Sequence, residues 1–89
     1  MNKQKKKPET LTISFNHDRK YIELGYNIAY YRKHTGLTQE QLAEAVGVSR
    51  QHIGAIEAPN ILRSISLDLL FNIADVLDVE PSKLITFRD

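Results

Sequence analysis

The sequence predicts an all-α fold in which five short helices form one small domain. Three observations support this prediction. The chain has 89 residues, of which 42% are hydrophobic and 26% charged, and this suits one globular domain with a modest core. Apolar residues recur at spacings of three and four along most of the chain, as in helices that bury one face. Helix-capping residues and glycines separate these periodic segments.

The composition excludes several classes of protein. The chain contains no cysteine, which excludes disulfides, thiolate catalysis and cysteine-based zinc sites. No apolar run approaches the ~20 residues that span a bilayer, and no signal segment is recognised, so we expect a soluble, cytoplasmic protein. The histidines have no metal-ligand spacing, and phosphate-loop and nucleophile motifs are absent. We therefore expect no metal, no cofactor and no enzyme activity.

Residues 1–17 are predicted to form a flexible basic arm. Four lysines lie within residues 3–7, and the apolar and polar residues of 11–15 alternate as in a short strand. Residues 1–34 carry eight Lys and Arg against three Asp and Glu, whereas residues 35–89 carry four against eight. This asymmetry indicates a polyanion bound on one side of the molecule, although a lysine tail that only improves solubility is the alternative.

The predicted helical domain, residues 18–89, begins with a helix over 18–34. Its apolar stripe consists of Tyr21, Leu24, Ile28 and Tyr31. Asp18 is the expected N-cap, and Gly36 is the expected stop.

Residues 38–57 have the spacing of a helix-turn-helix. Thr38 and Gln41 can form a capping box for the first helix, and Gly47 is expected to turn the chain with a positive φ. Ser49 is the expected cap of the second helix, which then places Ile53 and Ile56 toward the interior.

Two further helices complete the predicted bundle. After a loop at 58–65, Ser66 is the expected cap of a helix over 67–77. The residues expected to be available for burial are Leu67, Leu70, Phe71, Ala74 and Leu77. A short fifth helix starts at Pro81, which suits a first turn.

The run Leu37-Thr38-Gln39-Glu40-Gln41-Leu42-Ala43-Glu44-Ala45-Val46-Gly47-Val48-Ser49-Arg50, followed by Ile53 and Ile56-Glu57, resembles the Cro and lambda-repressor-like (XRE-type) DNA-binding domains. The resemblance covers residues 23–86. It implies a compact five-helix lambda-repressor-like fold with the recognition helix at 49–57, which would enter the DNA major groove.

The outward side of this recognition helix presents Arg50, Gln51, Gly54 and Ala55 as expected base contacts. Arg can bridge O6 and N7 of guanine, and Gln can bridge N6 and N7 of adenine. Gly54 would permit close approach of the helix to the groove, unless it is only a tolerated poor helix former. Ala55 could contact a thymine methyl group. Contact of Arg50 or Gln51 with phosphate alone is the alternative.

A second set of residues is expected to contact phosphates. It consists of Thr38, Gln39, Ser49, His52 and Arg63. The Gln39 contact is implied by the resemblance. His52 could instead be simply solvated, and Arg63 lies in a loop that is longer than the family pattern. The resemblance also implies a structural salt bridge between Arg32 and Glu57, with Arg32 on phosphate as the alternative.

The leading functional interpretation is a small transcriptional repressor that binds a palindromic operator in double-stranded DNA as a homodimer. Ile85 and Phe87 are the candidate dimer contacts, with segment 11–15 as the alternative. An antitoxin that binds its operator and a partner toxin is the second interpretation. A restriction-modification controller and a protein-interaction module without DNA binding are the others.

Overall fold

The computed structural model describes residues 17–61 and 64–87, and within these residues every regular element is an α-helix. The predicted strand at 11–15, the lysines of residues 3–7 and Arg63 lie outside the described residues. The strand and the Arg63 contact therefore stay predictions.

Five helices follow in the predicted order, within a residue or two of the predicted limits. They are α1 (Asp18–Thr35), α2 (Gln39–Val46), α3 (Arg50–Glu57), α4 (Leu67–Leu77) and α5 (Pro81–Leu84). The all-α prediction is confirmed for the described residues.

Local hydrogen bonds define where the helices of the central pair begin and end. The Thr38 hydroxyl accepts from the Gln41 backbone N–H at 3.0 Å, and the Thr38 N–H donates to the Gln41 side chain at 2.9 Å, so the capping box is complete. The Ser49 hydroxyl caps α3 by accepting from the His52 N–H at 3.1 Å. Between the helices Gly47 has φ +82°, a left-handed conformation that glycine adopts without strain.

The first helix begins differently from the prediction. Asp18 is the first helical residue, while His17 occupies the N-cap position without a side-chain cap bond. The Asp18 carboxylate therefore lies in the first turn, where its negative charge still interacts favourably with the positive end of the helix dipole.

The core lies where α1 to α4 meet, and α5 closes one end of it. Its fully buried large side chains are Ile28, Leu42, Ile53, Ile73 and Leu84. The expectation for α4 was partly wrong, because Leu67 is 65% exposed and Phe71 is 46% exposed, whereas Leu69 and Ile73 are buried. This helix carries more apolar residues than one buried face can hold, so the spacing alone did not identify the inward stripe.

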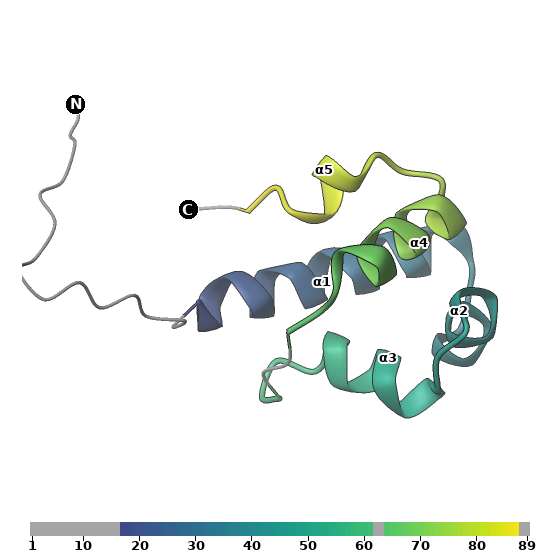
Figure 1. Ribbon diagram of the computed structural model, residues 1–89, viewed down its shortest axis with the longest axis horizontal. Helices are drawn as coiled ribbons and strands as arrows, with labels where there is room; N and C mark the ends of the chain where they lie inside the picture. The colour runs from purple at the N-terminus through teal and green to yellow at the C-terminus, as the bar shows by residue number, and fades with distance from the viewer. Residues whose placement is uncertain (1–16, 62–63, 88–89) are drawn as a thin grey trace, which may run out of the picture.

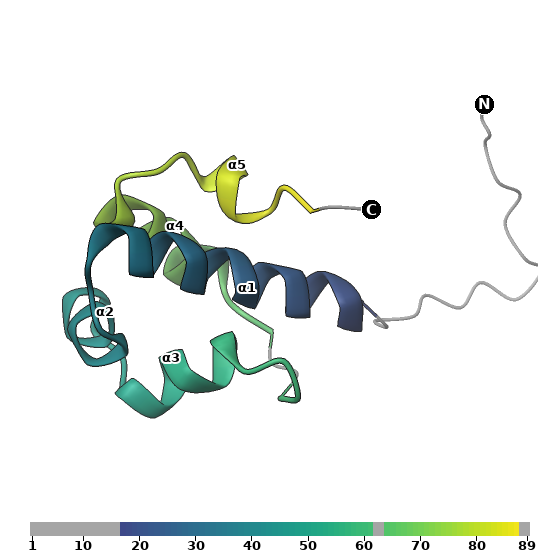
Figure 2. The same ribbon diagram turned by 180° about the vertical axis from the view of Figure 1, so that it is seen from behind.

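The long helix α1 runs through the middle of the molecule, between α3 and α5. In both views α3 lies on one side of α1 and α5 on the other (Figures 1 and 2). The outward face of α3 is therefore not covered by any other described helix, and this arrangement exposes the candidate site.

Candidate nucleic-acid interface

The third helix separates its side chains into an inner and an outer set. Ile53 and Ile56 are buried against the core, while Arg50 and Gln51 at the N-terminal end are exposed. Gly54 and Ala55 are partly exposed. All four of the expected base-contacting residues therefore have some surface exposure on α3.

The side chain of Arg50 runs along α3 past position 54 and reaches Gln39 at the start of α2. Its Nη1 donates to the Oε1 of Gln39 at 2.8 Å. A Cβ placed on Gly54 would lie 3.7 Å from the same Nη1 and 3.6 Å from Gln39 Oε1, which is ordinary van der Waals distance. The described part of the protein therefore has room for a methyl group at position 54, and both interpretations of Gly54, close approach to DNA and a tolerated poor helix former, stay open.

Gln39 links α2 to both ends of α3. Its Nε2 donates to Glu57 Oε1 at 2.9 Å while its Oε1 accepts from Arg50. The second hydrogen on Nε2 is left for another acceptor, so the expected phosphate contact remains chemically available. The link to Arg50 was not expected from the sequence, because the distance between the two helices is a tertiary property.

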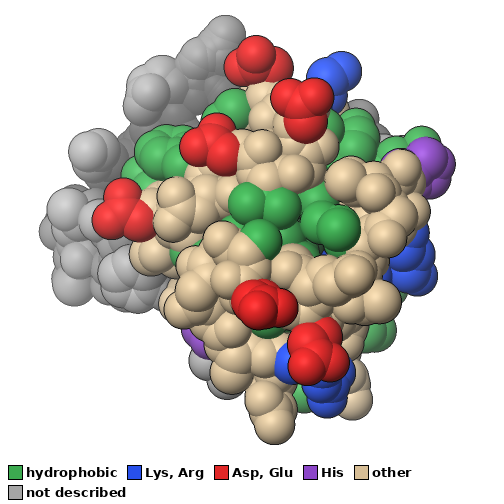
Figure 3. Space-filling view, turned by 90° about the vertical axis from the view of Figure 1, so that its right-hand side faces the viewer, with side chains coloured by type: hydrophobic (Ala, Val, Ile, Leu, Met, Phe, Trp, Pro, Cys, Tyr) green, Lys and Arg blue, Asp and Glu red, His purple; other side chains and the backbone are tan. Residues whose placement is uncertain are grey.

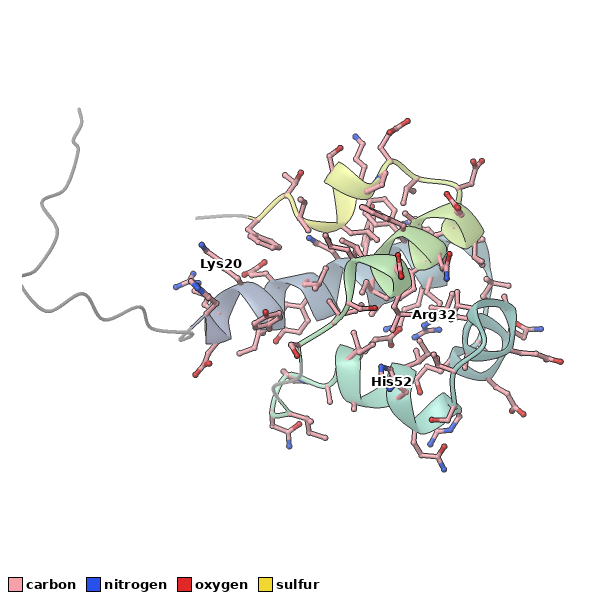
Figure 4. The ribbon with its side chains drawn as sticks, in the orientation of Figure 1. Lys20, Arg32 and His52 are labelled. Atoms are coloured by element: carbon pink, nitrogen blue, oxygen red, sulfur yellow. The ribbon has the colours of Figure 1, made fainter. Side chains whose placement is uncertain are left out.

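Arg32 and Glu57 form the ion pair that the resemblance implied. Arg32 donates from Nε to Glu57 Oε2 at 2.7 Å and from Nη2 to Oε1 at 2.9 Å, and its Nη1 donates to the Leu37 carbonyl at 2.7 Å. The two side chains are only 9% and 6% exposed. Figure 4 shows Arg32 reaching from α1 into the region between α1, α2 and α3, away from the outer surface of α3.

A glycine in the middle of α1 allows α3 to approach closely. A Cβ on Gly25 would collide with the carbonyl oxygen of Ile56 and lie 3.3 Å from the Glu57 Cα. Sequence reasoning missed this residue, although a buried-face glycine inside a long helix was the available signal. The close crossing brings the Glu57 end of α3 within reach of Arg32.

Among the described residues, the other candidate phosphate contacts are Thr38, Ser49 and His52, which lie at the N-caps or in the first turns of α2 and α3. The hydroxyl oxygens of Thr38 and Ser49 accept the capping hydrogen bonds, which leaves each hydroxyl hydrogen free to donate. His52 is partly exposed on α3 (Figure 4). Donors from two helix starts therefore border the outer surface of α3.

The end of the molecule formed by α2 has a different character. Figure 3 faces this end and shows acidic side chains around a small hydrophobic patch. Its helix α2 carries Glu40 and Glu44, which are both exposed. Figure 3 also shows Lys and Arg side chains toward the edges of this face. The acidic groups of α2 disfavour a polyanion bound at this end.

The two candidate dimer residues near the C-terminus differ in exposure. Ile85 is 50% exposed, whereas Phe87 is partly buried and packs against the core. Phe87 therefore already packs within its own chain, and a part for either residue in a dimer stays a prediction.

Two other expectations concern the described residues as a whole. Residues 17–61 and 64–87 contain no group of three or more His, Asp or Glu side chains arranged to hold a metal ion. In the same residues no helix combines the length and apolar character that a membrane crossing requires.

Comparison with known proteins adds independent information. The helix-turn-helix family HTH_3 matches residues 28–84. The control protein C.SmaI of Serratia marcescens is 38% identical over 63 residues, which are 71% of this chain and 73% of that protein. The SinR transcriptional regulator of Bacillus licheniformis is 33% identical over 66 residues, and the match spans 59% of its length.

Solved structures agree with this match. The restriction-modification controller C.AhdI of Aeromonas hydrophila superposes with a TM-score of 0.66 at 33% identity, covering 72% of this chain and 94% of that one. SinR, a master regulator for biofilm formation, superposes in its complex with DNA with a TM-score of 0.65 at 33% identity, covering 71% and 98%.

Proposed function

Because the chain belongs to the helix-turn-helix family HTH_3, we propose that it is a small transcriptional regulator that binds a specific double-stranded DNA sequence. The observation that carries this proposal is the uncovered outer face of α3, on which Arg50 and Gln51 are exposed while Ile53 and Ile56 anchor the helix. A transcriptional regulator must be in the same compartment as the DNA that it binds. This requirement agrees with the cytoplasmic location expected from the sequence.

The chemistry of α3 suits readout in the major groove. An α-helix fits this groove, and its first residues reach the base edges. In this proposal Arg50 binds guanine, Gln51 binds adenine, and Gly54 and Ala55 allow the helix to come close. Each bidentate contact discriminates against the wrong base by about 1–3 kcal/mol.

Donors at the starts of the two helices would hold the DNA backbone. Thr38, Gln39 and Ser49 surround these helix starts, and His52 and Arg63 extend the proposed set of phosphate contacts. Such contacts supply affinity and orientation but no sequence information. One domain offers few of them, so we propose that a homodimer occupies two half-sites of a palindrome.

The relatives help to choose among the regulatory roles. They are a control protein, a restriction-modification controller and a biofilm regulator, so they favour a regulator over an antitoxin. Repression remains the leading proposal. A restriction-modification controller is the second candidate, and the match to C.SmaI and C.AhdI is the observation that favours it.

Selection of bound sequences from random DNA duplexes tests the proposal. At about 0.15 M salt the protein should enrich a palindrome with half-sites about 10 base pairs apart. The Arg50→Ala variant should lose this enrichment. Lys83→Ala is the matched control, because it also removes one positive charge but lies on α5, on the other side of α1 from α3.

Three outcomes would contradict parts of the proposal. Enrichment of no sequence by the unmodified protein would contradict specific DNA binding by this chain alone. Equal losses from Arg50→Ala and Lys83→Ala would contradict base readout by Arg50, because a general charge effect would then explain both. A single half-site without a palindrome would contradict the dimer.

A further inference from the structure

A groove between α1 and α5 exposes aromatic surface on the side of α1 that faces away from α3 (Figures 1 and 2). Its volume is about 480 Å³, and its lining residues are Tyr26, Asn27, Tyr30, Tyr31, Lys83 and Thr86. Tyr26 is 50% exposed and Tyr30 is 52% exposed. Aromatic rings that share one groove form an apolar surface, and a segment that covers it removes this surface from water.

Asn27 holds the two walls of this groove together. Its Nδ2 donates to the carbonyl oxygen of Leu84 at 2.9 Å and to that of Thr86 at 3.0 Å. The N–H groups of Thr86 and Phe87 have no backbone acceptor in the described part of the chain. Residues 85–87 therefore lie beside α1 with backbone donors still available, and an extended segment that lies next to them can accept these hydrogen bonds.

The segment before α1 has the composition to cover such a groove. Residues 11–15, which lie outside the described residues, alternate between apolar and polar side chains. In an extended chain successive side chains point to opposite faces, so one face of this segment is entirely apolar. Its residues are Leu11, Ile13 and Phe15.

The length of this segment matches the distance along α1. Residues 11–15 lie three to seven positions before α1 begins at Asp18, so an extended chain places them up to about 10–23 Å from the start of the helix. Tyr26 and Tyr30 lie eight and twelve positions after Asp18, which corresponds to about 12–18 Å along the helix axis. A chain that folds back along α1 therefore brings its apolar face to the two tyrosines.

The charge at the far end of the groove complements the rest of the arm. The connection from α4 to α5 lies at the end of the molecule where α1 leads into α2 (Figures 1 and 2). A hollow of about 330 Å³ there is lined by the exposed carboxylates of Asp75, Asp78 and Glu80. The lysines within residues 3–7 precede residue 11 by four to eight positions, so they extend up to about 13–26 Å further in this direction.

We propose that residues 11–15 fold back along α1 and bind in the groove between α1 and α5 of their own chain, with their apolar face against Tyr26 and Tyr30. The lysines of residues 3–7 then lie at the acidic end formed by α4 and α5. Because the segment is tethered, its effective concentration at the groove is high, and a small contact area is enough for binding. Ile85 does not line this groove, so its predicted part in a dimer is a separate matter.

Paramagnetic broadening of NMR signals tests this proposal on the full chain. The sequence contains no cysteine, so a nitroxide attached to Ser14→Cys labels one position only. The amide signals of residues 26–30 and 83–86 should broaden most, and those of α3, on the other side of α1, should broaden least. Broadening spread evenly over the described helices would overturn the proposal.

Two matched pairs of substitutions, made in the labelled chain, test the contact itself. Ile13→Asp should abolish the selective broadening, whereas Thr12→Asp adds the same charge to the polar face and should preserve it. Tyr30→Ala should reduce the broadening, whereas Leu67→Ala, which removes an exposed side chain outside the groove, should not. Equal losses within either pair would overturn the proposed contact. The amide spectrum of each variant verifies that the helices remain folded.

A mixed sample distinguishes the chain's own segment from that of a second copy. Spin-labelled protein without ¹⁵N is mixed with ¹⁵N-labelled protein that carries no nitroxide. The proposal predicts no selective broadening in this mixture. Broadening of residues 26–30 would overturn the intramolecular site and would place residues 11–15 in the groove of another molecule.

The lysine contact is tested with the nitroxide on Gln4→Cys. At about 0.05 M salt the signals of residues 75–80 should broaden, and this broadening should be lost at about 0.5 M salt, because salt screens exposed charges. The broadening from the label at position 14 should persist, since apolar contacts are not screened. Absence of broadening at residues 75–80 at low salt would overturn the proposed position of the lysines.

Discussion

At the scale of single residues, the polar network shows which properties can be inferred from a motif. The pairing of Arg32 with Glu57 followed from a resemblance, because both residue types stand where related domains carry them. The coupling of Gln39 to Arg50 could not be inferred in this way, since it depends on a 2.8 Å approach between side chains of two different helices.

Replacing Arg32 tests the structural role of the ion pair. Arg32→Ala leaves the buried Glu57 carboxylate with one side-chain hydrogen-bond partner among the described residues, the Gln39 amide, so the free energy of unfolding should fall by about 3–5 kcal/mol. Urea unfolding measures this loss, with Lys33→Ala on the exposed side of α1 as the control. Strong loss of DNA binding at an unchanged melting temperature would instead indicate that Arg32 contacts phosphate.

Replacing Gly54 distinguishes a role in DNA approach from a tolerated helix-breaking residue. A methyl group fits in the free protein, so Gly54→Ala should stabilise it by about 0.5–1 kcal/mol through helix propensity. If the helix backbone comes close to the groove, operator affinity should fall despite this gain in stability. Unchanged or improved affinity would show that position 54 is not closely approached by the DNA.

At the scale of helices and their contacts, caps were easier to predict than buried faces. The capping box at Thr38 and the serine caps depend on residues two or three positions apart, so local sequence is enough to identify them. The inward face of α4 was only partly predicted, because an apolar-rich helix offers several candidate stripes and its neighbours decide among them.

The two serine caps form a matched pair. The hydroxyls of Ser49 and Ser66 each accept a backbone N–H at 3.1 Å, so replacing either with Ala should cost about 1 kcal/mol of stability. Only Ser49 lies at the start of α3, and therefore only Ser49→Ala should also weaken DNA binding. Equal affinities of the two variants for the operator would contradict a phosphate contact by Ser49.

The crossing of α1 and α3 depends on a missing side chain. Gly25→Ala would force the two helix backbones apart, because its Cβ meets a carbonyl oxygen that cannot rotate away. We expect a loss of about 1–3 kcal/mol or more in unfolding experiments, as for other overpacked cores. Gly54→Ala is the control glycine substitution, because a Cβ at that position meets no close contact. If Gly25→Ala lowers the free energy of unfolding no more than Gly54→Ala does, the close crossing is contradicted.

At the scale of the whole molecule, charge and shape favour one side for DNA. The outer face of α3 is uncovered and bordered by hydrogen-bond donors, whereas the α2 end is rich in acidic groups (Figure 3). The exposed apolar residues away from α3 include Ile85, which makes the α5 side a candidate for self-association.

Sedimentation equilibrium tests this dimer prediction. A twofold interface contains each contact residue twice, so Ile85→Asp should weaken association at least about tenfold. Leu67→Asp is the control, because Leu67 is an exposed apolar residue on α4, whereas Ile85 directly follows α5. A larger effect of Leu67→Asp would move the interface to α4, and an unmodified protein that stays monomeric both free and on DNA would contradict a dimer altogether.

The all-α class, the helix order, the N-caps of α2, α3 and α4, and the helix-turn-helix were accessible from sequence, because they depend on hydrophobic periodicity and on residues close together in the chain. The close approach at Gly25, the outward position of Leu67 and Phe71, and the link from Arg32 to Arg50 were not. These features depend on how helices distant in sequence pack against one another. Packing selects one buried face from several apolar candidates and brings side chains of different helices within hydrogen-bonding distance, and no spacing along the chain encodes either outcome directly.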